Sequence, residues 1–229
     1  MTKYKVEIVT SDLHSSLIAA EGGADRIELC DNLAVGGTTQ SFGVIKACRE
    51  KITIHLFPII RPRGGDFVYS DEEYEIIKDD IKLCKQLNCD GVVLGLLTKE
   101  GNIDIQRSAR LVDLAYPMDA TFHRAFDRCN DPFKALEEII EMGFTRILTS
   151  GQQPTAPEGV DLLKDLIQKA GERIIIMPGS GVRKENIQSL AYATGAVELH
   201  SSLRIANQEH FSKKDVEELV SALRSGVSS

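Results

Sequence analysis

The chain alternates short apolar segments with amphipathic segments eight times along its 229 residues. The apolar segments read as buried strands, and they lie at residues 5–9, 26–30, 53–60, 91–96, 119–125, 146–149, 173–177 and 196–200. Strand–helix repetition predicts a parallel sheet with right-handed crossovers, and eight units predict an α/β fold closed into a TIM-type (β/α)8 barrel. An open doubly wound sheet is the main alternative. It is disfavoured by the number of units and by the loop at residues 10–14, which lacks the glycines of a dinucleotide fingerprint.

The segments between the strands carry helix start and stop signals. Asp131-Pro132 gives an N-cap followed by proline at the first helical position, and Gly143 ends that helix. Ser70 and Ser212 each open a capping box. No linker rich in Pro, Gly or Ser interrupts the pattern. We therefore predict one domain over residues 1–229, with a C-terminal helix at about 212–224.

Composition limits the partners that the chain can bind. The formal net charge is −7 and no long basic run exists, which argues against nucleic acid. No apolar run reaches membrane-spanning length and the N-terminus has no apolar signal region, so we expect a cytoplasmic protein without membrane contact. The five cysteines are odd in number and irregularly spaced, as is typical of reduced thiols. The sequence leaves open whether the chain forms a homo-oligomer.

Reactive side chains recur where the predicted strands end. In a barrel these ends meet at one mouth, where such folds place their active sites. The candidates for catalysis are Glu7, Glu28, Arg61, His123, Arg124, Asp127 and His200. Glu7, Glu28 and a third glutamate, Glu198, stand between apolar neighbours on strands one, two and eight, which are adjacent in a closed barrel. A buried carboxylate needs a partner, and Arg61 and His123 are the obvious ones. A catalytic role and a structural ion-pair network remain equally open.

His123 lies in the segment Thr121-Phe122-His123-Arg124-Ala125-Phe126-Asp127, which ends the fifth predicted strand. Strand alternation predicts that Thr121, His123 and Ala125 share one face. The histidine could be a general base, a metal ligand or a hydrogen-bonded core residue. Its position beside Arg124 and Asp127 at the mouth favours function.

Several loops have the composition of an anion site. Two arginines flank a proline just after the third strand and precede two glycines, and arginine offers a rigid fork of donors for carboxylate or phosphate. Glycine and serine follow strands six, seven and eight, where barrels often bind phosphate through backbone N–H groups. The predicted anion-binding residues are Arg61, Arg63, Ser150, Gly179, Ser180, Gly181 and Ser201.

Long ordered segments of the chain resemble one known family. They are residues 22–30 (GGADRIELC), 36–39 (GGTT), 61–67 (RPRGGDF), 121–127 (TFHRAFD), 146–151 (RILTSG) and 198–200 (ELH). From about residue 4 to residue 202 the chain resembles the CutC family, which is named for copper homeostasis. The resemblance implies a cytosolic TIM-type barrel with a role in copper handling.

The sequence departs from the family pattern at one thiol. The family commonly has a cysteine near the end of strand one, where this chain has Val9, so Cys30 is the remaining candidate ligand for Cu(I). Cu(I) prefers soft thiolate or thioether ligands. Two hypotheses therefore stand. One is a cytosolic copper-binding or copper-trafficking protein. The other is a barrel enzyme acting on a small anionic or phosphorylated metabolite.

Overall fold

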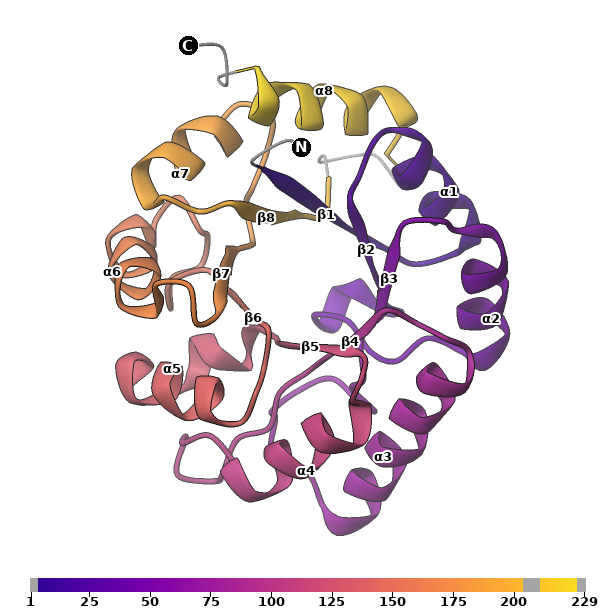
Figure 1. Cartoon of the computed structure of the whole chain (residues 1–229), viewed down its shortest axis with the longest axis vertical. Helices are drawn as coiled ribbons and strands as arrows, with labels where there is room; N and C mark the ends of the chain where they lie inside the picture. The colour runs from indigo at the N-terminus through magenta and orange to yellow at the C-terminus, as the bar shows by residue number, and fades with distance from the viewer. Residues whose placement is uncertain (1–3, 204–210, 226–229) are drawn as a thin grey trace.

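Eight parallel strands stand in a ring in the computed structural model, which describes residues 4–203 and 211–225 (Figure 1). The strands are β1 (Lys5–Thr10), β2 (Arg26–Leu29), β3 (His55–Pro58), β4 (Gly91–Leu94), β5 (Asp119–Phe122), β6 (Arg146–Thr149), β7 (Ile175–Pro178) and β8 (Glu198–Ser201). They form two parallel ladders, β3-β2-β1-β8 and β4-β5-β6-β7. The bridge between Ile59 and Val93 joins β3 to β4, and β7 lies beside β8. The predicted TIM-type barrel is confirmed.

Helices surround this ring and cover its outer face (Figure 1). They are α1 (Leu13–Glu21), α2 (Phe42–Lys51), α3 (Asp71–Gln86), α4 (Ile105–Ala115), α5 (Pro132–Glu141), α6 (Val160–Ala170), α7 (Ile187–Thr194) and α8 (Lys213–Arg224), with 3₁₀ helices η1 (Leu33–Val35) and η2 (Arg124–Arg128). None of the helices in the described ranges combines the length and the apolar character that a membrane span requires.

The helix starts follow the local sequence signals. The Ser70 hydroxyl accepts the backbone N–H of Glu73, and Ser212 accepts that of Asp215, so both capping boxes form. Asp131 caps α5 by accepting two backbone N–H groups, and Pro132 occupies the first turn. Such caps satisfy N–H groups that have no partner within the helix. The helix expected at about 212–224 is α8.

Side-chain alternation along the strands produces two different interiors. Ile8, Ile27 and Leu29 are completely buried within the large apolar layer between strands and helices. Residues of the opposite parity point into the barrel. There Phe57 belongs to a small apolar cluster with Val9, Cys30, Ile59 and Val93. The rest of the barrel interior is strongly polar, and that polarity positions the candidate site.

The fifth strand ends earlier than its sequence suggests. Alternation over residues 119–125 predicts a strand through Ala125, but β5 stops at Phe122 and η2 begins at Arg124. His123 lies between them and caps η2, because its Nδ1 accepts the backbone N–H of Ala125 at 3.2 Å. The chain turns at this cap, and the strand ends before Ala125. Thr121, His123 and Ala125 therefore do not share one strand face as predicted.

Candidate functional site

A cavity of about 560 Å³ lies at the carboxyl ends of the strands. We call this end of the barrel the mouth. The structure brings six of the seven candidate catalytic side chains to the cavity wall: Glu28, Arg61, His123, Arg124, Asp127 and His200. Glu7 lies beneath them and reaches the site through His200. The size falls in the range of small-molecule sites, and charged groups from several loops converge on it.

The candidate anion-binding residues divide into two groups. Arg61, Ser180 and Gly181 line the cavity, whereas Arg63, Ser150, Gly179 and Ser201 do not. Arg63 is held at the outside of its loop by Glu73 at 2.5 Å and Asp66 at 2.9 Å. The Ser201 hydroxyl donates to the Val182 carbonyl at 2.8 Å. The side chains of Arg63 and Ser201 therefore bond to neighbouring protein groups and do not face the cavity.

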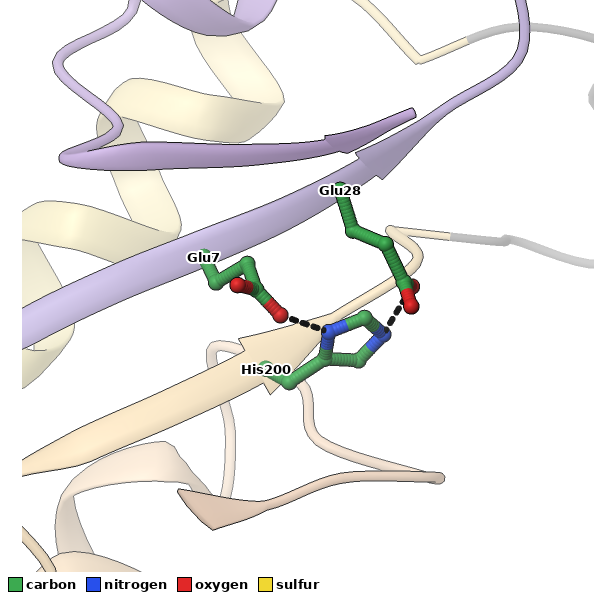
Figure 2. A group of neighbouring side chains, drawn as sticks. All are labelled: Glu7, Glu28 and His200. Carbon is green, nitrogen blue, oxygen red and sulfur yellow. Dashed lines mark hydrogen bonds and ion pairs between the residues drawn. The ribbon is translucent and has the colours of Figure 1, made fainter. Parts of the chain in front are cut away.

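His200 lies between two buried glutamates at the floor of the cavity (Figure 2). Its Nδ1 is 2.7 Å from Oε1 of Glu7, and its Nε2 is 3.7 Å from Oε2 of Glu28. β1 pairs with both β2 and β8, so the three side chains come from adjacent strands. One ligand atom from each residue lies within 4.8 Å of the others, which makes this the group in the described ranges that could hold a metal ion.

The two glutamates differ in their electrostatic surroundings. Burial opposes ionisation of Glu7, but Arg26 and the hydrogen bond from His200 outweigh it and lower the pKa of Glu7 to about 2. Burial raises the pKa of Glu28 to about 7, and the neighbouring charge of Glu7 contributes in the same direction. Glu7 is therefore a permanent acceptor for Nδ1–H. Glu28 is the carboxyl that exchanges a proton near neutral pH.

His200 itself is poised to carry a proton. Burial disfavours its charged form, but the hydrogen bond to Glu7 and the charge of Glu28 outweigh burial and raise the pKa of His200. Because Glu7 accepts from Nδ1, the second nitrogen, Nε2, faces Glu28. A histidine oriented by a carboxylate on one nitrogen and presenting the other is the arrangement found at many metal centres and in general acid–base catalysis.

The strand glutamates have partners other than the expected Arg61 and His123, and that expectation is wrong. Arg26 bonds to Glu7 through Nε and to Glu198 through Nη2, the latter at 2.7 Å. Arg146 donates to the same Glu198 oxygen at 2.9 Å. Both guanidiniums stack on Phe57, with distances to the ring centroid of 5.0 and 5.5 Å. A layer of ion pairs thus fills the barrel beneath the cavity.

Alternation could have identified these two arginines. Arg26 stands two residues before Glu28, so strand geometry places both on the inner face of β2. Arg146 begins β6, and its side chain also points inward, towards Glu198. Both arginines stand at strand starts, away from the mouth. The structure shows that Glu7 and Glu198 belong to the ion-pair layer and that Glu28 stands at its upper edge.

His123 is a neutral member of the cavity wall. It is 4% exposed, and burial together with the charge of Arg61 lowers its pKa to about 3. Its Nδ1 accepts the Ala125 N–H, which places the proton on Nε2. A histidine with so low a pKa is a poor proton acceptor at neutral pH. The pKa values therefore favour Glu28 over His123 as a general base.

Arg61 is buried with only 3% of its surface exposed. Its guanidinium donates to the carbonyls of Val35 and Gly37, each at 2.8 Å, and to that of Gly65 at 3.0 Å. It also stacks on Phe67 at 4.8 Å from the ring centroid. These bonds tie the loop after β2 to the loop after β3, so Arg61 shapes the wall as well as lending it charge.

Asp127 organises the loop that follows β6. It accepts from the Thr149 hydroxyl at 2.5 Å and from the Ser150 backbone at 3.1 Å. Arg124 bridges Asp127 and Ser150, because it donates to the Asp127 carboxylate at 2.7 Å and to the Ser150 hydroxyl at 2.9 Å. Ser150 is completely buried, and Asp127 and Ser150 serve this loop geometry. Arg124 and Asp127 are both partly exposed and line the cavity, whereas Ser150 does not.

Cys30 lines the cavity within the apolar cluster around Phe57 and Val9. Every cysteine of the chain is buried and none forms a disulfide. The group able to hold a metal consists of Glu7, Glu28 and His200 and does not include this thiol. Val9 belongs to the same apolar cluster, and among the described residues no second thiol lines the cavity. The donors gathered at the floor are imidazole and carboxylate.

Comparison with known proteins identifies relatives along most of the chain. The model of the CutC family matches residues 4–205. A Chromobacterium violaceum protein named as a CutC family protein is 51% identical over 199 residues, which cover 87% of this chain and 81% of that protein. The human copper homeostasis protein cutC homolog is 46% identical over 201 residues, which cover 88% of this chain and 74% of the human protein.

Solved structures support the same relationship and the fold. A candidate copper homeostasis protein CutC from Streptococcus agalactiae superposes with a TM-score of 0.83 at 37% identity, over 88% of this chain and 99% of that chain. Thiamine phosphate pyrophosphorylase from Pyrococcus furiosus superposes with a TM-score of 0.67 at 15% identity, over 99% of this chain and 98% of that one. The second likeness concerns the barrel fold alone.

Proposed function

The chain belongs to the CutC family, and from that premise we propose that it serves copper homeostasis by binding a copper ion at the mouth of its barrel. Nε2 of His200 and the carboxylate of Glu28 are the protein ligands in this proposal. Glu7 is the residue that orients His200. The copper ion is the cargo of the protein and needs no catalytic step.

The observation that carries this proposal is the bond from His200 Nδ1–H to Glu7. It fixes the ring so that Nε2 faces Glu28 across 3.7 Å. Ligating histidines commonly donate their other N–H to a carboxylate, which sets the tautomer and raises the basicity of the ligating nitrogen. The low pKa of Glu7 keeps that acceptor ionised at physiological pH. A cation would also compensate the buried charge of Glu28.

The donor set favours the oxidised ion. Imidazole and carboxylate suit Cu(II), whereas Cu(I) prefers thiolate and thioether. Cys30 is the thiol of the cavity wall in the described ranges, and it lies apart from the Glu28–His200 group. Cu(I) binding through Cys30 therefore remains a separate expectation, with a single thiolate as its donor. Cu(II) at His200 is the form that the geometry supports best.

A competitive titration tests the proposal. Protein stripped of metal is titrated with Cu(II) against a coloured chelator, in wild type and in Glu28→Gln, His200→Gln and Glu7→Gln variants. We expect each variant to lower the affinity by at least tenfold, in the range typical of altered ligands and their supporting carboxylates. Glu137→Gln and His55→Gln are matched controls, because Glu137 is partly exposed, His55 is exposed and both lie outside the cavity lining. Equal affinity in wild type, Glu28→Gln and His200→Gln would remove the site.

A second candidate is a barrel enzyme acting on a small anionic metabolite. The observation that favours it is the Glu28–His200 pair, a carboxyl and an imidazole that share a cavity with four arginines. Glu28, with a pKa of about 7, would exchange a proton with the substrate. The test is incubation of metal-free protein with phosphorylated sugars and dicarboxylates, followed by proton NMR. Turnover abolished by Glu28→Gln supports this candidate, and unchanged spectra remove it.

A further inference from the structure

Four arginines line the cavity of a chain whose formal net charge is −7. They come from three different loops: Arg61 follows β3, Arg124 and Arg128 lie in η2 after β5, and Arg183 follows β7. Their gathering at one point is therefore a product of the fold and not of a basic run in the sequence. Such focusing of one sign of charge in a concave site raises the local concentration of ligands of the opposite sign.

The acidic residues of the cavity leave three of these four arginines without a charge partner in the described ranges. Asp127 is paired with Arg124, and Glu28 faces His200. In the ranges 4–203 and 211–225, no carboxylate oxygen lies within 4.0 Å of a guanidinium nitrogen of Arg61, Arg128 or Arg183. The cavity carries an excess of positive charge.

The deepest of these cations marks where an anion would be held. Arg61 is buried and donates to backbone carbonyls, and in the described ranges it pairs with no carboxylate, although a buried charge is costly without an opposite one. Among the described residues, its Nε has no hydrogen-bond partner. Nε2 of His123 has none either, and that nitrogen carries the ring proton. The ring of Phe67 lies beside both groups. Its centroid is 4.8 Å from Cζ of Arg61 and 5.0 Å from the centroid of the His123 ring. Two unsatisfied donors thus share one wall.

We propose that the cavity binds a small organic dianion, whose phosphate or carboxylate groups are held by Arg183 and Arg128 and whose inner end faces the wall of Arg61, His123 and Phe67. Guanidinium forks bind both kinds of oxyanion, often through two parallel bonds. Arg183 is half-buried and Arg128 is exposed, so both remain free to turn towards a ligand. This site is independent of copper. It supplies the ligand class of the second candidate function, but it requires binding and no turnover.

Arg61 is the wrong residue with which to begin the test. Its bonds to Val35, Gly37 and Gly65 hold two loops together, and a variant would disturb the wall for structural reasons. Arg183 and Arg128 make no side-chain hydrogen bond or ion pair in the part of the chain that the structure describes. Their replacement leaves the barrel intact. Arg110 is the matched control, because it is an exposed arginine on α4 outside the cavity lining.

The experiment is calorimetric titration of metal-free protein at low ionic strength. The probes are inorganic phosphate, ribose 5-phosphate and succinate, with ribose as the uncharged control. We expect at least one anion to bind and ribose not to bind. Arg183→Gln should weaken binding by roughly ten- to a hundredfold, as expected for a charge-assisted hydrogen bond. Arg128→Gln should give a smaller loss, and Arg110→Gln should match wild type.

The outcomes separate the alternatives. Binding of ribose 5-phosphate without succinate identifies a phosphate site, and the reverse result identifies a carboxylate site. Binding without turnover keeps this site and removes the enzyme candidate. If no anion binds to wild type, or if Arg183→Gln and Arg128→Gln both bind as tightly as Arg110→Gln, the inference is overturned.

Discussion

Glu7 accepts a hydrogen bond from Nδ1 of His200 at 2.7 Å, across the seam where the first strand of the barrel meets the last. The two residues are 193 positions apart in sequence. Their bond depends on closure of the ring, since β8 pairs with β1 only in a closed barrel. It links the ion-pair layer below, through Arg26, to the cavity above, through Nε2. Fold and candidate site therefore share one buried contact.

Glu28 should lower the stability of the metal-free protein at neutral pH. Its pKa is about 7 in the folded chain and 4.5 in an ordinary environment, so the unfolded state releases its proton first as pH rises. The free energy of unfolding is thus fully retained below about pH 4.5 and is lost progressively up to pH 7. Glu28→Gln should be more stable than wild type at pH 8 by roughly 1–3 kcal/mol.

Urea unfolding of both proteins at pH 4.5 and pH 8, with metal removed, measures this difference. The two should be nearly equal in stability at the lower pH. If Glu28→Gln is less stable than wild type at pH 8, the buried carboxylate stabilises the fold. The idea that the site keeps Glu28 although it lowers the stability of the protein would then be wrong.

Arg26 should be essential to the barrel interior. Replacement by methionine leaves Glu7 and Glu198 without their shared cation in a buried layer. Loss of one partner from a buried ion pair typically costs about 3–5 kcal/mol. Addition of Glu7→Gln to Arg26→Met should restore part of that loss, because Glu7 is then left without a guanidinium in the described ranges, whereas Glu198 keeps Arg146. Chemical denaturation of the single and double variants measures both effects.

The control for Arg26 is Arg173, whose pair with Glu137 is largely exposed. Arg173→Met should cost less than about 1 kcal/mol. If Arg26→Met unfolds at the same denaturant concentration as wild type, the ion-pair layer does not stabilise the barrel.

Gly91 should tolerate no side chain. A Cβ at this position would lie 2.5 Å from ring atoms of Phe57, which is buried beneath two guanidiniums and cannot easily move. Gly91→Ala should therefore destabilise the protein by about 1–3 kcal/mol. Gly43, in α2, has no atom within 4 Å of the same position. Gly43→Ala should be neutral or stabilising by up to about 1 kcal/mol. Thermal unfolding compares them, and equal effects would contradict the packing around Phe57.

Cys30 should make only a weak Cu(I) site. It is buried in an apolar cluster, and its neighbour on β1 is Val9 instead of a second thiol. One thiolate gives Cu(I) fewer soft ligands than it prefers. An anaerobic Cu(I) titration against a competing chelator should show weak binding in wild type. Tight one-to-one binding that disappears in Cys30→Ser would show that the thiol is the principal copper ligand.

The sequence predicts the barrel well because its signals are local and repeated. Apolar stretches of strand length and helix caps such as Ser70 and Asp131 depend on residues that are neighbours in sequence. These local signals recur in eight units. The place of Glu28 and His200 at the mouth follows from their positions at strand ends, whereas Glu7 lies one layer deeper than that rule predicts. Their mutual contact does not, because it depends on register between β1, β2 and β8.

The partners of the buried charges were the least predictable feature. Position at a strand end favours Arg61 as the partner of the glutamates, yet Arg61 bonds to loop carbonyls and Arg26 and Arg146 hold the carboxylates. The choice is decided by which side chains occupy the same depth inside the barrel, and depth is set by strand stagger. A cap such as that of His123 on η2 likewise ends a strand where alternation alone would continue it.

The most direct measurement of the central claim is an anomalous difference map at the copper absorption edge, from crystals grown with Cu(II). The account predicts a peak at the barrel mouth, within coordination distance of His200 Nε2 and the Glu28 carboxylate, with Glu7 still bonded to Nδ1. The peak should vanish in His200→Gln crystals prepared in the same way. Copper located only on surface histidines such as His55, or on Cys30 without His200, would contradict the account.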